Sequence, residues 1–176
     1  MVGGENVIVE IDESKFCSRK FNRGHEVPGC WVFGGVDRTN ERNIFAVVVA
    51  DRTAHTLIAN IRRYIRPGSI IYTDCWAAYN DLDLLDAGFQ HGSVNHTYNY
   101  VDPLSNVHIN TIEGTWNGIK RNINARLYTP ELVQGKLWEF VWRRRYPKSW
   151  DRMILIMKYI IVGFPEEMVN EDDNQV

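Results

Sequence analysis

The chain has 176 residues, of which 44% are hydrophobic and 24% are charged, and its formal net charge is −2. This composition is typical of one globular domain and excludes a disordered chain, a collagen-like chain and a small disulfide scaffold. The three cysteines, Cys17, Cys30 and Cys75, lack the C-x-x-C spacing of a zinc knuckle. Residues 1–10 lack the features of a signal peptide, and the longest apolar stretch, 153–164, is too short to span a bilayer of about 30 Å. We therefore expect an intracellular protein with reduced cysteines.

Charge is distributed unevenly along the sequence. The last eleven residues, 166–176, contain five acids and no base, which predicts a disordered tail. By contrast, residues 115–160 contain ten bases and three acids. Such a segment is typical of a face that binds phosphates, although a solvated helix surface has the same composition. The bases that we single out as candidate phosphate contacts are Lys120, Arg121, Arg126, Arg143, Arg144 and Arg145.

The periodicity of the apolar residues predicts alternating strands and helices. In chain order, the first half contains strands over 6–11, 30–36 and 44–50, a helix over 53–65 and a strand over 69–73. The second half contains a short helix over 76–85, a strand over 89–95, and helices over 107–124, 130–145 and 149–162. A strand hairpin followed by crossovers onto the same sheet is the order of a ribonuclease H-like α/β fold. We therefore expect one domain over 1–165, with a mixed five-stranded sheet flanked by helices and extra C-terminal helices.

Two aspartates follow apolar strands. Asp12 ends the predicted strand over 6–11, and Asp74 ends the predicted strand over 69–73. If these strands are neighbours, the two carboxylates lie side by side at one edge of the sheet, where ligands bind in open α/β sheets. Two such carboxylates repel each other, and a divalent cation relieves that repulsion.

A third acid, Glu113, lies in the predicted helix over 107–124 and shares one helical face with Asn110, Asn117 and Lys120. Three acids from separate elements can hold two divalent ions, which activate an attacking oxygen and stabilise a leaving oxygen at a phosphodiester. Lys120 is placed to contact a nearby phosphate. The sequence therefore predicts a two-metal site for phosphodiester chemistry.

Each acid also has an ordinary structural explanation. Asp74 is a candidate N-cap for the helix that follows it, and Asp12 can cap a turn through Ser14. A glutamate on a helix surface, such as Glu113, is usually solvated. From the residues alone, the catalytic and the structural interpretations both stay open.

Several motifs occur in the order of a known family. They are VEIDESKF at 9–16, WVFGGV at 31–36, IYTDCWAAY at 71–79, VNH at 94–96, FVWRRR at 140–145, and the spaced series His108, Asn110, Glu113, Trp116 and Lys120. Together these motifs resemble the ISXO-type transposase domain, an integrase-like DDE domain of bacterial insertion sequences and of their eukaryotic Merlin relatives. The resemblance extends over residues 7–146.

The resemblance implies a ribonuclease H-like fold, two Mg²⁺ or Mn²⁺ ions, and cleavage and strand transfer of DNA. Asp12 and Asp74 match the first two acids of the family, Glu113 matches the third, and Lys120 matches a lysine that follows it. Because some members use Asn in place of Glu, Asn110 is a second candidate for the third position or a neighbour of it. The implied partners are double-stranded DNA at transposon ends and targets, bound through the basic residues above, and further copies of the chain in the active state. No membrane partner is implied.

Transposases of this kind usually carry an amino-terminal DNA-binding region, often zinc-binding, and this sequence contains no C-x-x-C pair. This leaves open a fragment, a domain that relies on a partner, or a domesticated non-catalytic DNA-binding domain descended from a transposase. A ribonuclease H-like nuclease that acts on another nucleic acid is a further alternative. The motifs after Asn95 favour the eukaryotic branch, which predicts a nuclear location, whereas a bacterial protein would be cytoplasmic.

Overall fold

The computed structural model describes residues 1–16, 29–75, 77–79, 88–95, 101–103, 105–123, 129–149, 151, 153–154 and 157. The chain divides into two compact units, Met1–Val141 and Trp142–Val176, which are described separately. The first unit contains the sheet. The described part of the second unit contains the end of a helix, where the rings of Trp142 and Tyr146 lie 6.2 Å apart. None of the described helices is both long enough and apolar enough to cross a membrane.

Three antiparallel strands form one half of the sheet. β1 (Ile8–Phe16) pairs with β2 (Cys30–Asp37), which pairs in turn with β3 (Ile44–Val49), as the predicted hairpin requires. The prediction that the first strand ends at Ile11, with Asp12 just after it, is wrong. Because β2 continues the ladder from Asp12 opposite Gly34 to Phe16 opposite Cys30, Asp12 lies inside β1. Its proposed role as a turn cap through Ser14 is therefore also wrong.

The other half of the sheet is parallel. The helix α1 (Ala54–Tyr64) follows β3, with the Thr53 side chain accepting a hydrogen bond from the backbone N–H of Thr56 as an N-cap. β4 (Ile70–Asp74) then pairs in parallel with β1, and β5 (Gln90–Val94) pairs in parallel with β4. The strand order is β3-β2-β1-β4-β5.

The segment between β4 and β5 is described only in part. The short 3-10 helix η1 (Ala77–Tyr79) falls within the helix predicted over 76–85, and the remaining residues of that prediction lie outside the described residues.

Two longer helices follow the sheet. The helix α2 (Asn110–Asn122) begins three residues later than predicted, and α3 (Pro130–Arg145) has the predicted bounds. The residues of α3 up to Val141 belong to the first unit. Of the helix predicted over 149–162, the structure describes residues 149, 151, 153–154 and 157, which are helical, and the other residues of that prediction lie outside the described ranges. The acidic tail over 166–176 lies outside them entirely.

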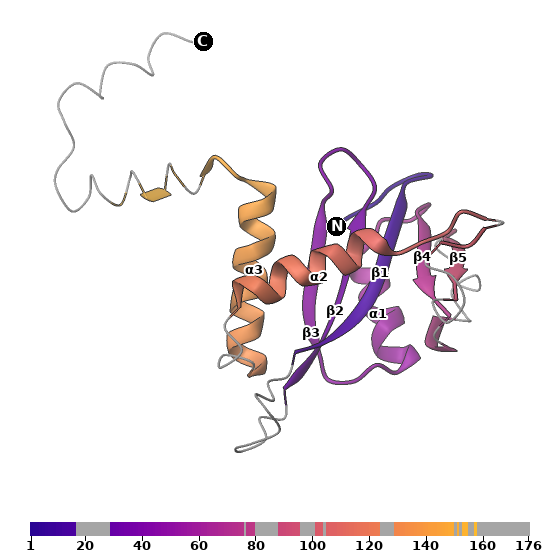
Figure 1. Cartoon of the computed structure of the whole chain (residues 1–176), viewed down its shortest axis with the longest axis horizontal. Coiled ribbons are helices and arrows are strands. Elements are labelled where there is room, and N and C mark those ends of the chain that lie inside the picture. Colours follow the sequence, from indigo (N-terminus) through magenta and orange to yellow (C-terminus); the bar gives the residue numbers. More distant parts are fainter. Residues whose placement is uncertain are drawn as a thin grey trace, which may run out of the picture. The chain divides into compact units, whose positions relative to one another are not determined.

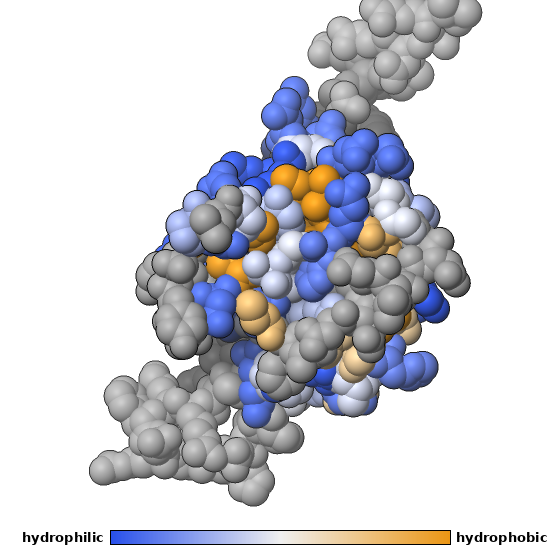
Figure 2. Space-filling view, turned by 90° about the vertical axis from the view of Figure 1, so that its right-hand side faces the viewer, coloured by the Kyte–Doolittle hydropathy of each residue, from blue (hydrophilic) through white to orange (hydrophobic). Residues whose placement is uncertain are grey.

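The sheet separates two hydrophobic cores. One core joins Phe16 and Val32 to α2 and the first turns of α3, and the other joins Ile11 and Phe33 to α1. Figure 1 shows α2 passing across β1 and β2, with α1 on the other side of the sheet. Because side chains alternate along a strand, β1 presents Asp12 to the α2 face and Glu13 to the α1 face. On the face in Figure 2, hydrophilic side chains surround small hydrophobic areas.

Candidate active site

Asp12 and Asp74 lie at the same level on neighbouring strands. β1 and β4 pair with Val9 opposite Ile71 and Glu10 opposite Tyr72. Continuing this register by two residues sets Asp12 beside Asp74, the last residue of β4. The prediction that these two strands are neighbours is therefore confirmed.

The helix α2 brings Glu113 to the same face of the sheet. Glu113 lies in the first turn of α2, which contacts β1 and β2. The buried residues of this helix include Ile112 and Ile119, whereas Glu113, Asn110 and Asn117 are exposed. The polar face predicted from their spacing is therefore present.

The other two acids act electrostatically on Asp12. Burial raises the pKa of Asp12 from its ordinary value of 3.8 to about 6, and the negative charges of Asp74 and Glu113 add to this rise. Hydrogen bonds from Trp116 and from the backbone N–H of Glu13 oppose it. The charges of both acids thus act on Asp12 across the same face of the sheet. The three carboxylates that the sequence singled out thus lie on one face of the sheet.

Carboxylate oxygens are the donors that Mg²⁺ and Mn²⁺ prefer, so the chemistry of these three acids fits such an ion. Among the residues that the structure describes, no three His, Cys, Asp or Glu side chains are arranged as a set that could hold a metal ion. The fit is therefore one of donor chemistry.

Trp116 links the helix directly to the first aspartate. Its indole N–H donates a hydrogen bond of 2.9 Å to Oδ2 of Asp12, and its ring is almost fully buried. The ring lies against Gly34, the residue opposite Asp12 on β2, where an added Cβ would approach Cη2 of Trp116 to 2.6 Å. Gly34 therefore allows the indole to approach the strand closely, and the ladder runs through it without a bulge.

A buried carboxylate two residues earlier fixes the start of α2. Glu10 has no exposed surface, and its Oε2 accepts hydrogen bonds from the backbone N–H groups of Thr111 (2.8 Å) and Ile112 (3.0 Å). Its Oε1 accepts from Nε of Arg38 at 2.7 Å. Since Ile109 at the N-cap supplies no side-chain hydrogen bond, Glu10 satisfies the first N–H groups of α2 and complements the helix dipole.

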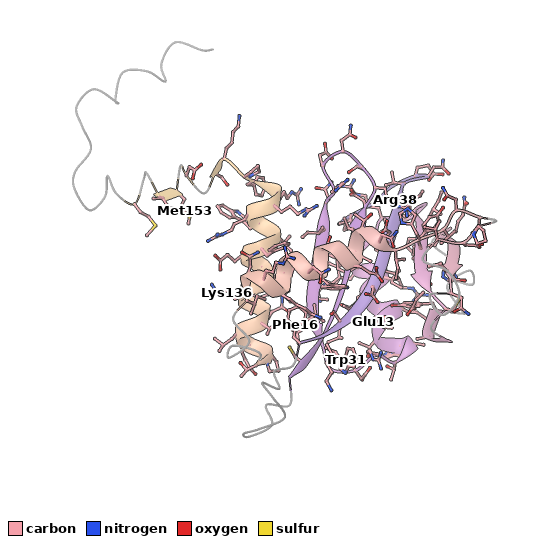
Figure 3. The ribbon with its side chains drawn as sticks, in the orientation of Figure 1. Glu13, Phe16, Trp31, Arg38, Lys136 and Met153 are labelled. Atoms are coloured by element: carbon pink, nitrogen blue, oxygen red, sulfur yellow. The ribbon has the colours of Figure 1, made fainter. Side chains whose placement is uncertain are left out.

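Arg38 completes this anchor. Its Nη2 donates to Nδ1 of His108 (3.0 Å) and to the backbone carbonyl of His108 (2.9 Å), just before α2 begins. Its guanidinium lies over the ring of Tyr72 on β4, 5.0 Å from the centroid. Figure 3 shows Arg38 beside the first turn of α2. The turn after β2, the strand β4 and α2 are therefore held together around Glu10.

Glu13 is a fourth acid near this point, on the opposite face of the sheet. The Tyr79 hydroxyl hydrogen-bonds to Oε1 of Glu13. Burial, followed by the charges of Asp12 and Asp74, raises the pKa of Glu13 to about 8, against the opposing charge of Arg52. Glu13 and Trp31 are labelled in Figure 3, and the guanidinium of Arg52 stacks on the Trp31 ring at 3.8 Å. Glu13 thus belongs to the packing between the sheet and η1.

The predicted phosphate contacts belong to different parts of the chain. Lys120 is half-buried on α2, with its Nζ 5.3 Å from the centroid of the Phe16 ring, and Arg121 is exposed. Arg126 lies outside the described residues. The exposed residues Arg143, Arg144 and Arg145 belong to the second unit.

The model of the ISXO2-like transposase domain family matches residues 2–144. The chain belongs to this family. An uncharacterized transposase-like protein of Haemophilus influenzae is 34% identical to this transposase domain over 121 residues, which are 68% of this chain and 94% of that protein. The resemblance stated from the sequence motifs is therefore confirmed.

Among solved structures, the transposase domain is similar to the HTLV-2 integrase catalytic core domain, solved in complex with magnesium in a dimeric form. The TM-score is 0.51 and the identity 16%, over 79% of this chain and 86% of that one. At this identity the likeness concerns the fold. Together with the mixed five-stranded sheet, it confirms the predicted ribonuclease H-like class.

Two residues of this site are not predicted as parts of it from the sequence. The position of Trp116 on the apolar face of its helix predicts burial and gives no sign of an acidic partner. Glu10 does carry a signal, because an acid inside the apolar run 7–11 indicates a paired buried charge. Both residues act through contacts more than a hundred positions apart in the chain, which local patterns do not encode.

Proposed function

We propose that this chain is the catalytic domain of a DDE-type DNA transposase, which cleaves and joins DNA phosphodiesters with the help of two Mg²⁺ or Mn²⁺ ions. The observation that carries the proposal is the convergence of Asp12, Asp74 and Glu113 on one face of the sheet, where the charges of the other two add to the raised pKa of Asp12. Membership of the ISXO2-like family supports the same conclusion.

The three acids are the residues that would hold the ions. Their mutual repulsion favours the binding of divalent cations between them, and the similar integrase core, which was solved in complex with magnesium, supports this choice of metal. When bound, such ions would supply activation of the attacking oxygen and stabilisation of the leaving oxygen. The chain contributes the placement: β1 and β4 fix the two aspartates, and α2 fixes Glu113.

The DNA backbone would be held by the basic residues. Lys120 lies two helical turns after Glu113, so that it is suited to a phosphate near the acids. Arg121 on α2 and Arg143, Arg144 and Arg145 in the second unit are exposed and would contact phosphates without reading the base sequence. The dimeric form of the integrase core supports a homo-oligomer as the active state.

The test compares substrates and variants in one cleavage assay with Mn²⁺. We expect cleavage of duplex DNA by the parent protein, and a loss of at least 100-fold in Asp12→Asn and Glu113→Gln. Asn110→Ala should retain most of the activity if Glu113 is the third acid. The reverse result for Glu113→Gln and Asn110→Ala would assign the third position to Asn110 instead.

The same assay separates the alternatives. Cleavage of an RNA–DNA hybrid in preference to duplex DNA would identify a nuclease of another specificity. A protein that binds duplex DNA, shows no cleavage of either substrate, and binds equally well after Asp12→Asn would be a non-catalytic descendant of a transposase.

A further inference from the structure

The ring of Trp116 is buried, and its indole nitrogen donates a hydrogen bond. Only 4% of the residue is exposed, and the ring packs edge-on against Phe16, with centroids 6.3 Å apart. A buried indole N–H needs an acceptor, which in most proteins is a neutral oxygen. Here the acceptor is Oδ2 of Asp12 at 2.9 Å, so that the hydrogen bond is charge-assisted whenever Asp12 is ionised.

The neighbouring strand is shaped to admit this indole. A Cβ at position 34 would lie 2.6 Å from Cη2 of Trp116 and 2.9 Å from the backbone carbonyl oxygen of Phe45, both closer than real Cβ contacts. Glycine at this position therefore allows the ring to approach the sheet next to Asp12. The ring position is thus set by Gly34 on one side and by Phe16 on another.

The indole N–H orients the Asp12 carboxyl group by its hydrogen bond to Oδ2. The two oxygens of a carboxylate offer about four lone-pair sites in all, and this bond occupies one of them. Lone pairs therefore remain for a further ligand.

The same indole also fixes the helix that carries Glu113. β1 holds α2 at two points, through Glu10 at the N–H groups of Thr111 and Ile112 and through Asp12 at Trp116. Two residues of strand advance about 6.6 Å, and the four to five residues of helix from these N–H groups to Trp116 advance about 6 to 7.5 Å. Because these advances match, α2 cannot slide along β1 without breaking hydrogen bonds at one of the two points, and Glu113 lies between them.

We propose that Trp116 is a positioning residue for the acidic site: its indole N–H holds Asp12 in the orientation in which Asp12 and Glu113 receive a divalent cation. This inference rests on the proposed function, because it assumes that the acids bind metal. It assigns to Trp116 a role beyond packing, and it explains why a glycine stands at position 34.

The experiment measures Mn²⁺ binding by titration calorimetry at pH 7.5, without DNA. Trp116→Phe keeps one aromatic ring at this position and removes the N–H, and we expect it to weaken Mn²⁺ binding by about 10-fold or more, as the loss of a hydrogen bond to a ligand does at metal sites. Ile119→Val is the matched control, because Ile119 is fully buried on the next turn of the same helix and donates no hydrogen bond from its side chain. It should bind Mn²⁺ within twofold of the parent at a comparable loss in melting temperature.

The outcomes separate this inference from the proposed function. If the parent binds Mn²⁺, Asp74→Asn does not, and Trp116→Phe binds as tightly as the parent, Trp116 has no positioning role. If the parent itself fails to bind Mn²⁺, or Asp74→Asn binds equally well, the metal site of the proposed function is contradicted instead.

A second measurement tests the inference without Trp116→Phe, in case that variant does not fold. In the parent labelled with ¹⁵N-tryptophan, six indole N–H signals are expected from the six tryptophans. Asp12→Asn should shift one of them strongly, and Mg²⁺ should shift the same signal in the parent. Six signals that stay unchanged on Asp12→Asn would overturn the inference.

Discussion

Asp12 sits where folding removes a carboxylate from water and brings other acids near it. Its pKa in the folded protein is about 6, against an ordinary value of 3.8, with burial as the main cause. The folded state therefore binds this proton more tightly than the unfolded state between about pH 4 and pH 6. On this account the free energy of unfolding falls as pH rises through that window, and the loss stays in full above it.

Asp12→Asn should therefore stabilise the metal-free protein at neutral pH. A difference of about two pKa units corresponds to roughly 3 kcal/mol at most, and we expect about 1–3 kcal/mol at pH 7.5, declining to none near pH 4. The Asn oxygen can still accept from the Trp116 indole, so packing is kept. Urea unfolding of both proteins at pH 4 and pH 7.5 measures the difference.

Asp51→Asn is the control of opposite sign. Hydrogen bonds from Thr56 and Thr53 lower the pKa of Asp51 to about 2, so that its charge stabilises the fold above that pH. Asp51→Asn should destabilise the protein at pH 7.5. A destabilised Asp12→Asn at pH 7.5 would contradict the electrostatic account of the site.

Gly34 gives a second prediction at the scale of single residues. Gly34→Ala should lower the free energy of unfolding by about 1–3 kcal/mol, because the new methyl would press on the Trp116 ring and on the Phe45 carbonyl. Gly135→Ala is the comparison, since a Cβ there meets nothing within 4 Å and alanine favours the helix by about 0.5–1 kcal/mol. Equal effects of the two substitutions in urea unfolding would argue against a tight approach at Gly34.

At the scale of elements, Glu10 connects the sheet to the helix that carries Glu113. It accepts hydrogen bonds from Arg38, from Thr111 and from Ile112 while fully buried. The ion pair with Arg38 is partly buried, because the Arg38 side chain is 24% exposed and the Glu10 side chain is fully buried. Removing the charge from one member of such a buried pair is strongly destabilising, because the other member is left buried without a counter-charge.

Glu10→Gln should thus destabilise the protein by about 2–4 kcal/mol, because an amide can replace only one of the two acceptor oxygens and leaves Arg38 without its counter-charge. Glu139→Gln is the matched control, since Glu139 pairs with Lys136 on the surface of α3 and should change stability by less than about 1 kcal/mol. Thermal unfolding of both variants makes the comparison. A loss at Glu10 no larger than at Glu139 would contradict its role as an anchor of α2.

The elements whose ends are coded locally are predicted well. Thr129 and Pro130 mark the start of α3, and α1 ends before Pro67 and Gly68, so both helices have nearly the predicted bounds. The predicted end of β1 is misplaced, because apolar periodicity stops at Ile11 while the strand continues on the strength of its pairing with β2. The predicted start of α2 is misplaced for the same kind of reason, since Glu10 on another element caps it.

The residues of the candidate site also differ in whether local sequence patterns predict them. Asp12, Asp74 and Glu113 are predicted from residue type, predicted element and motif order. That Asp12 lies beside Asp74 follows from the pairing of β1 with β4. The hydrogen bond from Trp116 and the anchor at Glu10 depend on how α2 lies on the sheet. No periodicity in the chain specifies how that helix and the sheet meet.

At the scale of the whole molecule, the net charge of −2 conceals a basic segment that suits DNA. The exposed arginines at 143–145 lie in the second unit, and the acids lie in the first. If these arginines bind phosphates, they contribute to affinity through the release of counterions, which makes binding salt-dependent.

Replacing Arg143, Arg144 and Arg145 together by alanine should therefore weaken binding to duplex DNA at low salt. The slope of log affinity against log salt should decrease by about 2 to 3, close to 0.9 for each phosphate that the variant no longer neutralises. Lys136→Ala is the control, because Lys136 is paired with Glu139, and its slope should stay close to that of the parent. Fluorescence anisotropy over a range of salt measures both, and an unchanged slope in the triple variant would place the DNA elsewhere.

The central claim is that Asp12, Asp74 and Glu113 form one metal-dependent site for phosphodiester chemistry. The most direct test is nicking of supercoiled plasmid with Mn²⁺ by the parent, by Asp74→Asn, and by Cys75→Ser as a control at the exposed neighbouring residue. We predict nicking by the parent and by Cys75→Ser, and none by Asp74→Asn. Nicking that persists in Asp74→Asn at the rate of the parent would contradict the account.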